Sequence, residues 1–384
     1  MKKNILIVVE GYFPAQKYGG PPVSIKNFCE LLKNEYNFYI MTRDYDIDGT
    51  RLEHIKEGWN ESNEANIIYL SRNKFNRFEF QEIIDEVNPD MIYINSFFDY
   101  ELSMKFILVS LKNKINILLA PRGQLLQGAM ERKKALKKLY LVMFKLFINN
   151  SLFSFQSTSS EETTVLHRIF PENKIIEIQN IPSTSKSLTN HIKEEKVLRL
   201  VFLSRIVEKK NLLYALEILE MLSLSISLDI YGPIEDKIYW EICQKKISEL
   251  PSNIVVVYKG LAEPKETINI FSNYDAFLFP TKSENFGHVI SESLIAGCPV
   301  IISDKTPWND IAKKEAGYVV PLENKNGFRD AIQDLFYMPK EQHKKFQENA
   351  RKYIEKNFQK DELKENIINA IFQIIRNNED DYER

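Results

Sequence analysis

The stretch from Ala276 to Ser303 constrains the fold more than any other part of this chain. It holds a short apolar run, a polar loop, helix-forming residues from His288 to Ala296, then Gly297, Pro299 and a second apolar run. Glycine accepts the left-handed backbone on which many helices end, and the proline prevents the helix from continuing. The stretch therefore predicts a strand, a loop, a helix and a second strand in succession.

Two carboxylates lie in this stretch. Glu284 is in the loop, and Glu292 follows His288 by one helical turn, so that both share a helix face. In an open α/β sheet, the loop that leaves a strand and enters a helix N-terminus is where anionic ligands bind. Carboxylates beside such a helix end indicate a ligand that carries hydroxyls and phosphates together, as a nucleotide-sugar does.

The rest of the chain alternates apolar runs with helix-forming segments. We predict strands at 4–9, 38–42, 66–71, 91–95, 115–120, 153–158, 174–179, 198–204, 227–231, 254–259 and 317–321. We predict helices at 24–33, with Ser24 as N-cap, and at 80–87, 100–111, 161–170, 211–221, 235–250, 264–272, 328–337, 340–357 and 360–376. Alternation of this kind is typical of parallel, doubly wound sheets.

We therefore expect an α/β protein with two Rossmann-like domains, residues 1–182 and 197–357, facing a central cleft. The loop-like stretch 183–196 is the predicted linker. Residues 358–384 hold a last helix with an apolar stripe, and we expect it to pack back on the first domain. The stripe consists of Leu363, Ile367, Ala370, Ile371 and Ile374.

Composition excludes several classes of protein. A length of 384 residues suits two domains, and a net charge of -2 gives no reason to expect a nucleic-acid partner. Three scattered cysteines and five scattered histidines indicate neither a disulfide framework nor a zinc site. The first apolar run ends at Glu10 and is too short for a signal peptide, and no apolar stretch reaches the roughly 18 residues of a membrane span. We expect a cytoplasmic protein.

Basic residues follow the strand predicted at 198–204. Arg205 comes directly after it, and Lys209 and Lys210 precede the next helix. In one parallel sheet this places positive charge on the same edge as Glu284. Arginine as a bidentate fork and lysine as a point charge suit a diphosphate, although a solvated lysine pair is an equal reading for Lys209.

Glycines also stand where a ligand could approach the backbone. Gly19 and Gly20 precede the first helix, where their N–H groups could reach a phosphate or simply form a flexible turn. Gly232 and Gly260 follow strands, and backbone groups around Tyr258 could bind a base edge. A plain turn is the alternative for both of these glycines.

These motifs resemble those of retaining GT-B glycosyltransferases of family 4, of the bacterial surface-polysaccharide type. Glu284 and Glu292 match the family's Glu-x7-Glu element, with Asn285, Phe286 and Gly287 between them. Similar elements stand, in order, at 12–20, 157–161, 179–182, 204–210 and 296–300, so the resemblance covers both halves of the chain.

The resemblance implies an enzyme of EC class 2.4 that moves a hexosyl unit from a nucleotide-diphosphate sugar, with retention, and needs no metal or cofactor. The acceptor would be a growing glycan of capsule or lipopolysaccharide, lipid-linked or not, bound on the side of the first domain. A protein that binds the nucleotide-sugar without catalysis is the alternative.

The same resemblance assigns roles to single residues. Glu284 would hold the hydroxyls of the donor sugar and Glu292 those of the ribose. Arg205 and Lys210 would neutralise the leaving diphosphate, which Gly19 and Gly20 would reach from the other domain. Asn285, Phe286, Gly287 and His288 would complete the donor site, with Gly232 and Tyr258 near the base.

The chain departs from the family pattern at three points. Asn211 and Ile181 replace glycines, and Pro121-Arg122-Gly123 stands where many members carry a histidine. We hypothesise that Arg122 serves as a cation in the cleft.

Other enzyme classes have weaker support. Asp44, Asp46 and Asp48 spell Asp-x-Asp twice, a metal-binding signature of the other main glycosyltransferase fold, but no nucleotide-sugar site builds around them. The glycine motifs of dinucleotide dehydrogenases and of P-loop NTPases are missing from the sequence.

A basic amphipathic segment runs from Met130 to Ile148 in the first domain. Six basic residues alternate there with apolar ones: Arg132, Lys133, Lys134, Lys137, Lys138 and Lys145. One reading is a surface helix that covers the sheet and turns a charged face to water. The other is peripheral contact with an anionic membrane at its inner face, where a lipid-linked acceptor lies.

Overall fold

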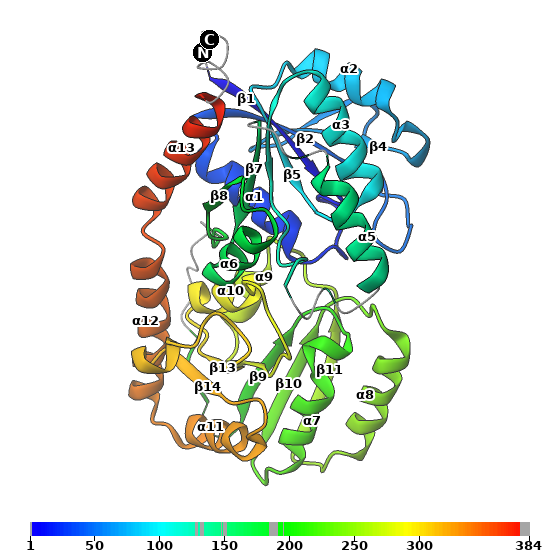
Figure 1. Cartoon of the computed structure of the whole chain (residues 1–384). Helices are drawn as coiled ribbons and strands as arrows, with labels where there is room; N and C mark the ends of the chain where they lie inside the picture. Colours follow the sequence, from blue (N-terminus) through cyan, green and yellow to red (C-terminus); the bar gives the residue numbers. More distant parts are fainter. Residues whose placement is uncertain are drawn as a thin grey trace. The chain divides into compact units, whose positions relative to one another are not determined.

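The computed structural model describes residues 2–126, 130, 134–146, 148, 152–183, 191–194 and 196–376. The chain forms two compact units (Figure 1). Unit 1 consists of Met1–Ile181 with Lys360–Arg384, and unit 2 is Pro182–Gln359. Residues 184–190 and 195 of the predicted linker lie outside the described residues.

Unit 1 is built on an eight-stranded sheet with the strand order β3-β4-β2-β1-β5-β6-β7-β8. The strands are β1 (Lys3–Val9), β2 (Tyr36–Arg43), β3 (Trp59–Glu61), β4 (Asn66–Leu70), β5 (Met91–Asn95), β6 (Asn116–Leu119), β7 (Phe153–Ser157) and β8 (Lys174–Glu177). All pairs are parallel except β3 with β4. Strand β3 was not predicted, because its three residues are too few to show an apolar period.

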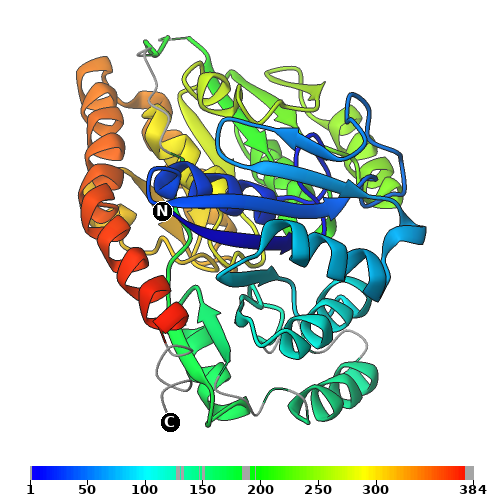
Figure 2. The ribbon, with the colours of Figure 1, turned by 90° about the horizontal axis from the view of Figure 1, so that it is seen from above.

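Helices cover both faces of this sheet. They are α1 (Gly20–Leu32), α2 (Arg77–Val87), α3 (Lys105–Lys112), α5 (Lys134–Lys145), α6 (Ser160–Ile169) and α13 (Lys360–Arg376). Leu6 and Val8 of β1 belong to the core that α2, α3, α5 and α6 complete. Ile5 and Ile7 point to the other core, which α1 and α13 complete (Figure 2). Because both faces are covered, β1 at the centre of the sheet is apolar from Ile5 to Val9.

The start of α1 corrects one sequence prediction. The helix begins at Gly20, with Gly19 as N-cap at φ 73°, and not with Ser24 as N-cap. Prolines at the first positions need no N–H partner there, which explains the earlier start. The Ser24 hydroxyl instead lies inside the helix and donates a 3.2 Å hydrogen bond to Asn180 Oδ1.

Two further helices of unit 1 can be compared with the sequence predictions. The helix predicted at 100–111 begins as a π-helical turn, η2 (Tyr100–Met104), before α3. In α13, the side chains of Ile367, Ala370, Ile371 and Ile374 are buried in the core shared with α1, and Leu363 packs against it.

Unit 2 is built on a six-stranded parallel sheet with the order β11-β10-β9-β12-β13-β14. The strands are β9 (Leu198–Leu203), β10 (Ile226–Tyr231), β11 (Ile254–Gly260), β12 (Ala276–Phe279), β13 (Val300–Ser303) and β14 (Gly317–Val320). The helices are η3 (Glu208–Lys210), α7 (Leu212–Glu220), α8 (Lys237–Glu249), α9 (Thr267–Phe271), α10 (His288–Ala296), η4 (Ile311–Lys314), α11 (Lys325–Tyr337) and α12 (Lys340–Asn357). Strand order reverses direction between β9 and β12, which makes this pair the topological switch point.

Two histidines of unit 2, one near its start and one on α12, both contact Asp275, the residue before β12. His191 Nε2 lies 2.9 Å from Asp275 Oδ1, and His343 Nε2 donates to the backbone carbonyl of Asp275 over 2.9 Å. The imidazole of His343 is 1% exposed. Burial lowers the pKa of His343 from its usual 6.5, against the raising effect of Asp275.

This depressed pKa predicts that stability falls in mild acid. Below about pH 6.5, His343 binds a proton in the unfolded chain but stays neutral in the folded one. The free energy of unfolding therefore falls as the pH decreases. Denaturant titrations at pH 7.5 and 5.5 should show a smaller loss for His343→Gln, which does not titrate, than for the wild-type chain. Equal losses in both proteins would contradict this account.

Candidate functional site

The site of unit 2 lies where two neighbouring strands end. Strands β9 and β12 are parallel neighbours, so the loops that follow them leave the same edge of the sheet. The first loop carries Arg205 and, in η3, Lys210, and the second carries Glu284. A switch point is where α/β sheets offer a crevice for ligands.

Lys210 and Glu284 form a direct ion pair across this point. The Lys210 ammonium donates to Glu284 Oε1, and the two side chains are only 13% and 11% exposed. Burial lowers the pKa of Lys210, whereas Glu284 raises it and the nearby charges of Arg205 and Lys209 lower it. The structure thus brings the predicted carboxylate and the predicted cations together at one edge.

The two loops are also joined through their backbones. The N–H of Lys282 donates to the carbonyl of Lys209 over 2.9 Å, and Asn211 Nδ2 donates to the carbonyl of Pro280 over 2.9 Å. Asn211 has φ 65°, a left-handed conformation that asparagine tolerates better than most residues. This explains how asparagine can stand at a position where the resemblance expects glycine.

Arg205 lies two residues after the end of β9 and is partly exposed. Its Nη1 donates to Glu235 Oε2 over 2.6 Å, and the two side chains are 31% and 38% exposed. A pair this exposed contributes little to stability. Its guanidinium can therefore exchange this partner for a phosphate at small cost.

The N-terminus of α10 faces the same loop. Its N-cap, Gly287, has φ 79°, no side chain caps the helix, and its first turn, all within the described residues, holds no acidic residue. The positive end of the helix dipole is therefore not neutralised by the helix itself. His288 and Glu292, one turn apart on α10, are each 8% exposed.

An aromatic cluster fixes the residues before α10. The ring of Phe286 lies 5.2 Å from that of Trp308 and 4.8 Å from that of His288, and Trp308 Nε1 donates to the carbonyl of Phe286. Trp308 was not predicted as part of this region, because nothing in its own sequence neighbourhood links it to the loop. Asn285, next to Phe286, is half-buried.

Gly232 and Tyr258 have structural contacts of their own. A Cβ atom on Gly232, which has φ 133°, would lie 1.9 Å from the carbonyl oxygen of Ser204. The Tyr258 hydroxyl donates to the carbonyl of Gly232 over 2.8 Å, and its ring lies 5.0 Å from that of Trp240. The close approach of two backbones explains the glycine without a ligand.

In unit 1, the loop before Gly19 is anchored by an aspartate. The Asp46 carboxylate accepts N–H groups of Gln16 at 2.9 Å, Lys17 at 3.2 Å and Ile47 at 2.8 Å. These bonds hold the chain that leads to Gly19 and Gly20. Across the ranges that the structure describes, no cluster of three His, Cys, Asp or Glu side chains could hold a metal ion.

Arg122 is enclosed in a hydrogen-bond network at the edge of unit 1. Its Nε and Nη2 donate to Asn95 Oδ1 over 3.0 and 2.7 Å, and Nη2 also donates to the Tyr93 hydroxyl over 2.7 Å. Its Nη1 donates to Asn180 Oδ1. The guanidinium therefore ties the ends of β5 and β6 to the segment after β8.

The structure also shows polar residues that sequence reasoning missed. Strands β1 and β5 form the switch point of unit 1, and there the Ser96 hydroxyl donates to Glu10 Oε1 over 2.6 Å. Burial raises the pKa of Glu10. The available signal was its position as the first polar residue after β1, at the carboxyl end of a buried strand.

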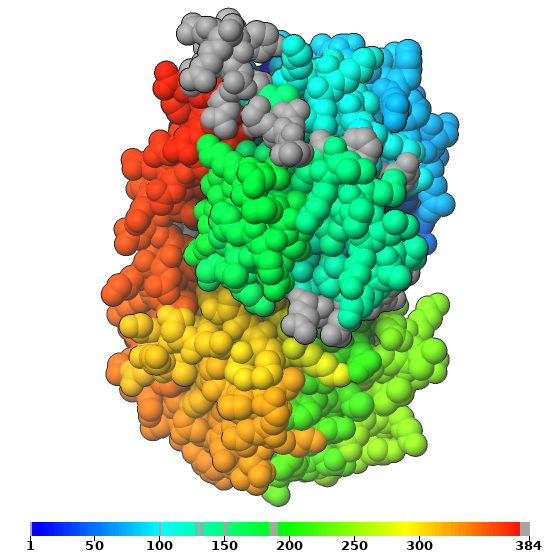
Figure 3. All heavy atoms as spheres, in the orientation of Figure 1, coloured from blue at the N-terminus to red at the C-terminus, as the bar shows by residue number. Residues whose placement is uncertain are grey.

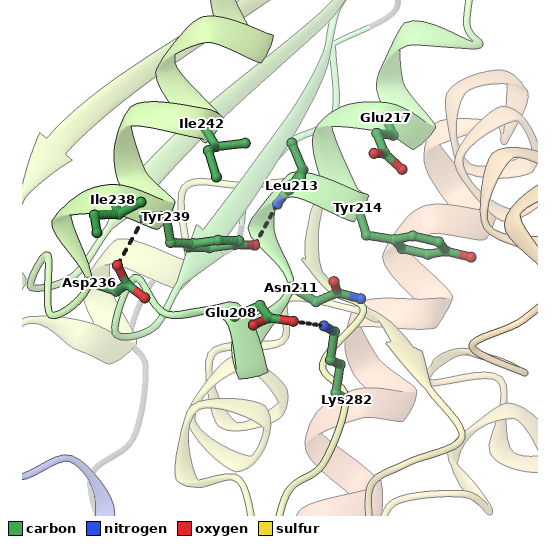
Figure 4. Close-up of a pocket in the computed structure, with 10 residues that line it drawn as sticks. All are labelled: Glu208, Asn211, Leu213, Tyr214, Glu217, Asp236, Ile238, Tyr239, Ile242 and Lys282. Carbon is green, nitrogen blue, oxygen red and sulfur yellow. Dashed lines mark hydrogen bonds and ion pairs between the residues drawn. The ribbon is translucent and has the colours of Figure 1, made fainter.

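A pocket of about 420 Å³ lies between α7 and α8 (Figure 4). Its lining includes the acidic residues Glu208, Glu217 and Asp236, and Glu208 pairs with Lys282 at 2.6 Å. Lys210 and Glu284 are not among its lining residues. The pocket is therefore separate from the ion pair, although Asn211, which lines it, directly follows Lys210 in the chain.

Comparisons with known proteins point to one class. Residues 185–353 match the family model described as "Glycosyl transferases group 1". An uncharacterized 41.2 kDa protein in the cps region of Klebsiella pneumoniae is 21% identical over 271 residues, which cover 68% of this chain and 70% of that protein.

Solved structures agree over almost the whole length. Sucrose-phosphate synthase from Thermosynechococcus elongatus has a TM-score of 0.73 at 15% identity, covering 97% of this chain and 99% of its own. The Anabaena protein HepE, in complex with UDP and glucose, has a TM-score of 0.69 at 12% identity, with 97% and 100% covered. A variant of S. aureus TarM has a TM-score of 0.68 at 14% identity, with 96% and 99% covered.

At these identities the structures show the fold, which is the GT-B fold of two Rossmann-like domains. The predicted fold class is thereby confirmed. The residues that match the family model, 185–353, fall within unit 2.

The tight approach at Gly232 gives a direct test of its structural role. We expect Gly232→Ala to lose about 1–3 kcal/mol of stability, because its Cβ would overlap the Ser204 carbonyl. Gly260→Ala is the matched control, since Gly260 also has positive φ, 81°, but its Cβ would meet nothing within 4 Å. Urea titrations that rank Gly260→Ala as the more damaging change would refute this assignment.

Proposed function

We propose that this protein is a retaining glycosyltransferase of family 4 that moves a hexosyl unit from a nucleotide-diphosphate sugar to a growing cell-surface polysaccharide. The observation that carries the proposal is the buried pair of Lys210 and Glu284 at the switch point of unit 2. A nucleotide-sugar suits this pair, because its diphosphate is an anion for Lys210 and its sugar offers hydroxyls to Glu284.

The roles follow from the charges that develop during transfer. The sugar gains positive charge and the leaving phosphate negative charge, so a carboxylate beside the one and cations beside the other lower the barrier. Glu284 accepts hydrogen bonds from the sugar hydroxyls, and Lys210 and Arg205 bind the diphosphate. The uncapped start of α10 at His288, with the residues before it from Asn285 to Gly287, adds backbone N–H groups to the same anion.

The step itself needs no protein nucleophile. The bond from the anomeric carbon to the diphosphate oxygen breaks, and its electron pair stays with that oxygen. The acceptor hydroxyl attacks from the same face and gives its proton to the leaving phosphate. Configuration is retained, and atoms and charges balance without a metal or a cofactor.

Further residues complete the proposed donor site. Buried Glu292 accepts the ribose hydroxyls, and the half-exposed ring of Tyr258, next to Gly232, flanks the base. In unit 1, Gly19 and Gly20 at the start of α1 offer backbone N–H groups that suit a phosphate. We assign Arg122 a positioning role, because its N–H groups already bind Asn95, Tyr93 and Asn180.

The relatives suggest the substrate classes. The HepE structure contains UDP and glucose, and the TarM structure contains UDP and alpha-GlcNAc-glycerol. The Klebsiella relative is named for a cps region. These names favour a UDP-sugar donor and a capsule-type acceptor, with lipopolysaccharide as the other acceptor class. Such an acceptor, if lipid-linked, is reached from the cytoplasm at the inner face of the membrane.

Turnover measurements test the pair directly. Thermal shifts with UDP-, GDP- and ADP-sugars identify the donor by mass action, and its transfer or hydrolysis is then followed with EDTA present. We expect Glu284→Gln and Lys210→Met to lower turnover on the order of 10²–10³-fold. Lys282→Met is the control, since Lys282 lies in the same loop as Glu284 but its side chain is in an exposed pair with Glu208, and turnover should stay near wild type.

Two results would argue against this function. Wild-type turnover in Glu284→Gln would remove the carboxylate from the reaction. Donor binding by the wild-type chain, without transfer or hydrolysis under any acceptor condition, would favour a protein that binds nucleotide-sugars without catalysis.

A further inference from the structure

Helix α5 carries an unusual outer surface. Five large apolar side chains on or directly after it are exposed: Leu136 at 67%, Leu139 at 59%, Val142 at 63%, Met143 at 49% and Leu146 at 79%. We call these five residues the α5 stripe. Single exposed leucines are common on proteins, but five within one short helix form a contiguous patch of the kind that marks an interaction site.

The opposite side of α5 already holds the helix to the sheet. Phe144 is fully buried, and its ring lies 4.5 Å from that of Phe97 and 5.8 Å from that of Phe153. Successive residues turn by about 100° around a helix, so Leu139, Val142 and Leu146 point away from the side of Phe144. Leu136 and Met143 lie on one flank of the helix, roughly 80° and 100° from Phe144. The exposed stripe is therefore not needed to pack α5 on unit 1.

This arrangement differs from that of an ordinary surface helix. A helix that only covers a sheet places polar residues on its outer side. In α5 the outermost residues are apolar, and the lysines occupy a flank. Figure 3 shows the α5 atoms, teal-green in the colour scale, open on the face in view.

The flank of the stripe is basic. Lys134, Lys138 and Lys145, at spacings of four and seven residues, line one side of the helix and are exposed. Residues 134–146 include no aspartate or glutamate. Arg132, Lys133 and Phe147, which belong to the same basic segment of the sequence, lie outside the described residues.

Charge and apolarity together select the partner. Lysines at the border of an apolar helix face can extend toward lipid phosphates while the face itself enters the acyl boundary. An anionic bilayer offers both features over any area, because its surface attracts lysines and its acyl boundary accepts apolar side chains. Among the helices that the structure describes, none is long and apolar enough to cross a bilayer.

We propose that the α5 stripe inserts into the interface of an anionic membrane, with Lys134, Lys138 and Lys145 on the lipid phosphates. The exposure and charge of α5 support membrane binding without reference to the enzyme's activity. Only the purpose of that binding, which is to bring the enzyme to a lipid-linked acceptor, rests on the proposed function. Membrane contact through the stripe, and not through charge alone, is the new element.

Vesicle flotation of the full chain tests this surface. Vesicles of phosphatidylcholine alone are compared with vesicles that contain phosphatidylglycerol, and binding should favour the anionic ones by about tenfold or more. Leu139→Gln/Met143→Gln/Leu146→Gln keeps good helix formers and should lose most of this binding. Lys134→Gln/Lys138→Gln/Lys145→Gln should lose the preference for anionic vesicles.

The control removes apolar surface elsewhere on unit 1. Phe78 is 72% exposed on α2 and Phe372 is 54% exposed on α13, and Phe78→Gln/Phe372→Gln should bind vesicles as the wild-type chain does. Circular dichroism and donor hydrolysis without vesicles report folding and catalysis separately. A stripe variant with wild-type hydrolysis but no vesicle binding supports the proposal even if the acceptor is not lipid-linked.

Other outcomes would overturn the proposal. These are a wild-type chain that binds neither kind of vesicle, or a stripe variant that floats as well as the wild type. Sedimentation that shows a wild-type dimer and a monomeric stripe variant would instead assign the stripe to contact between two copies of this chain.

Discussion

A buried ion pair holds the central loops of unit 2 together. Two charges that leave water cost more than their attraction returns unless their geometry is well satisfied, so such a pair is weak evidence for stability alone. Lys210 and Glu284 lie where the strand order of the sheet reverses, and Asn211 and the backbone of Lys282 brace the same loops. Because this edge is where α/β sheets offer a crevice for ligands, ligand binding explains the pair better than stability does.

Both units present polar groups at their switch points, but in different chemical forms. In unit 1 the Ser96 hydroxyl donates to the Glu10 carboxylate, and Arg122 donates to Asn95, the residue before Ser96. Unit 2 has a cation and a carboxylate beside an uncapped helix. The second combination suits a phosphorylated sugar, whereas the first suits hydroxyls. This contrast agrees with a donor bound by unit 2 and a glycan acceptor bound by unit 1.

Much of the fold was predictable because strand and helix periods differ. Helices 288–296, 340–357 and 360–376 appear with the bounds that the sequence predicted. Lys210 and Glu284 could be placed on one edge because parallel strands share their carboxyl ends. Contacts between distant residues could not be read in this way: the clash that requires Gly232 and the ring of Trp308 on Phe286 arise only in three dimensions. For α5, the spacing of apolar residues in the sequence predicts an apolar stripe. It does not predict that this stripe faces outward.

The most direct test of the central pair is a double-mutant cycle on donor binding, measured by titration calorimetry with the nucleotide-sugar that stabilises the protein best. If Lys210 and Glu284 bind the donor as a pair, Lys210→Met and Glu284→Gln each weaken donor binding about tenfold or more. The double variant then binds the donor no more weakly than the single variant with the lower affinity. Wild-type affinity in both single variants would contradict the account.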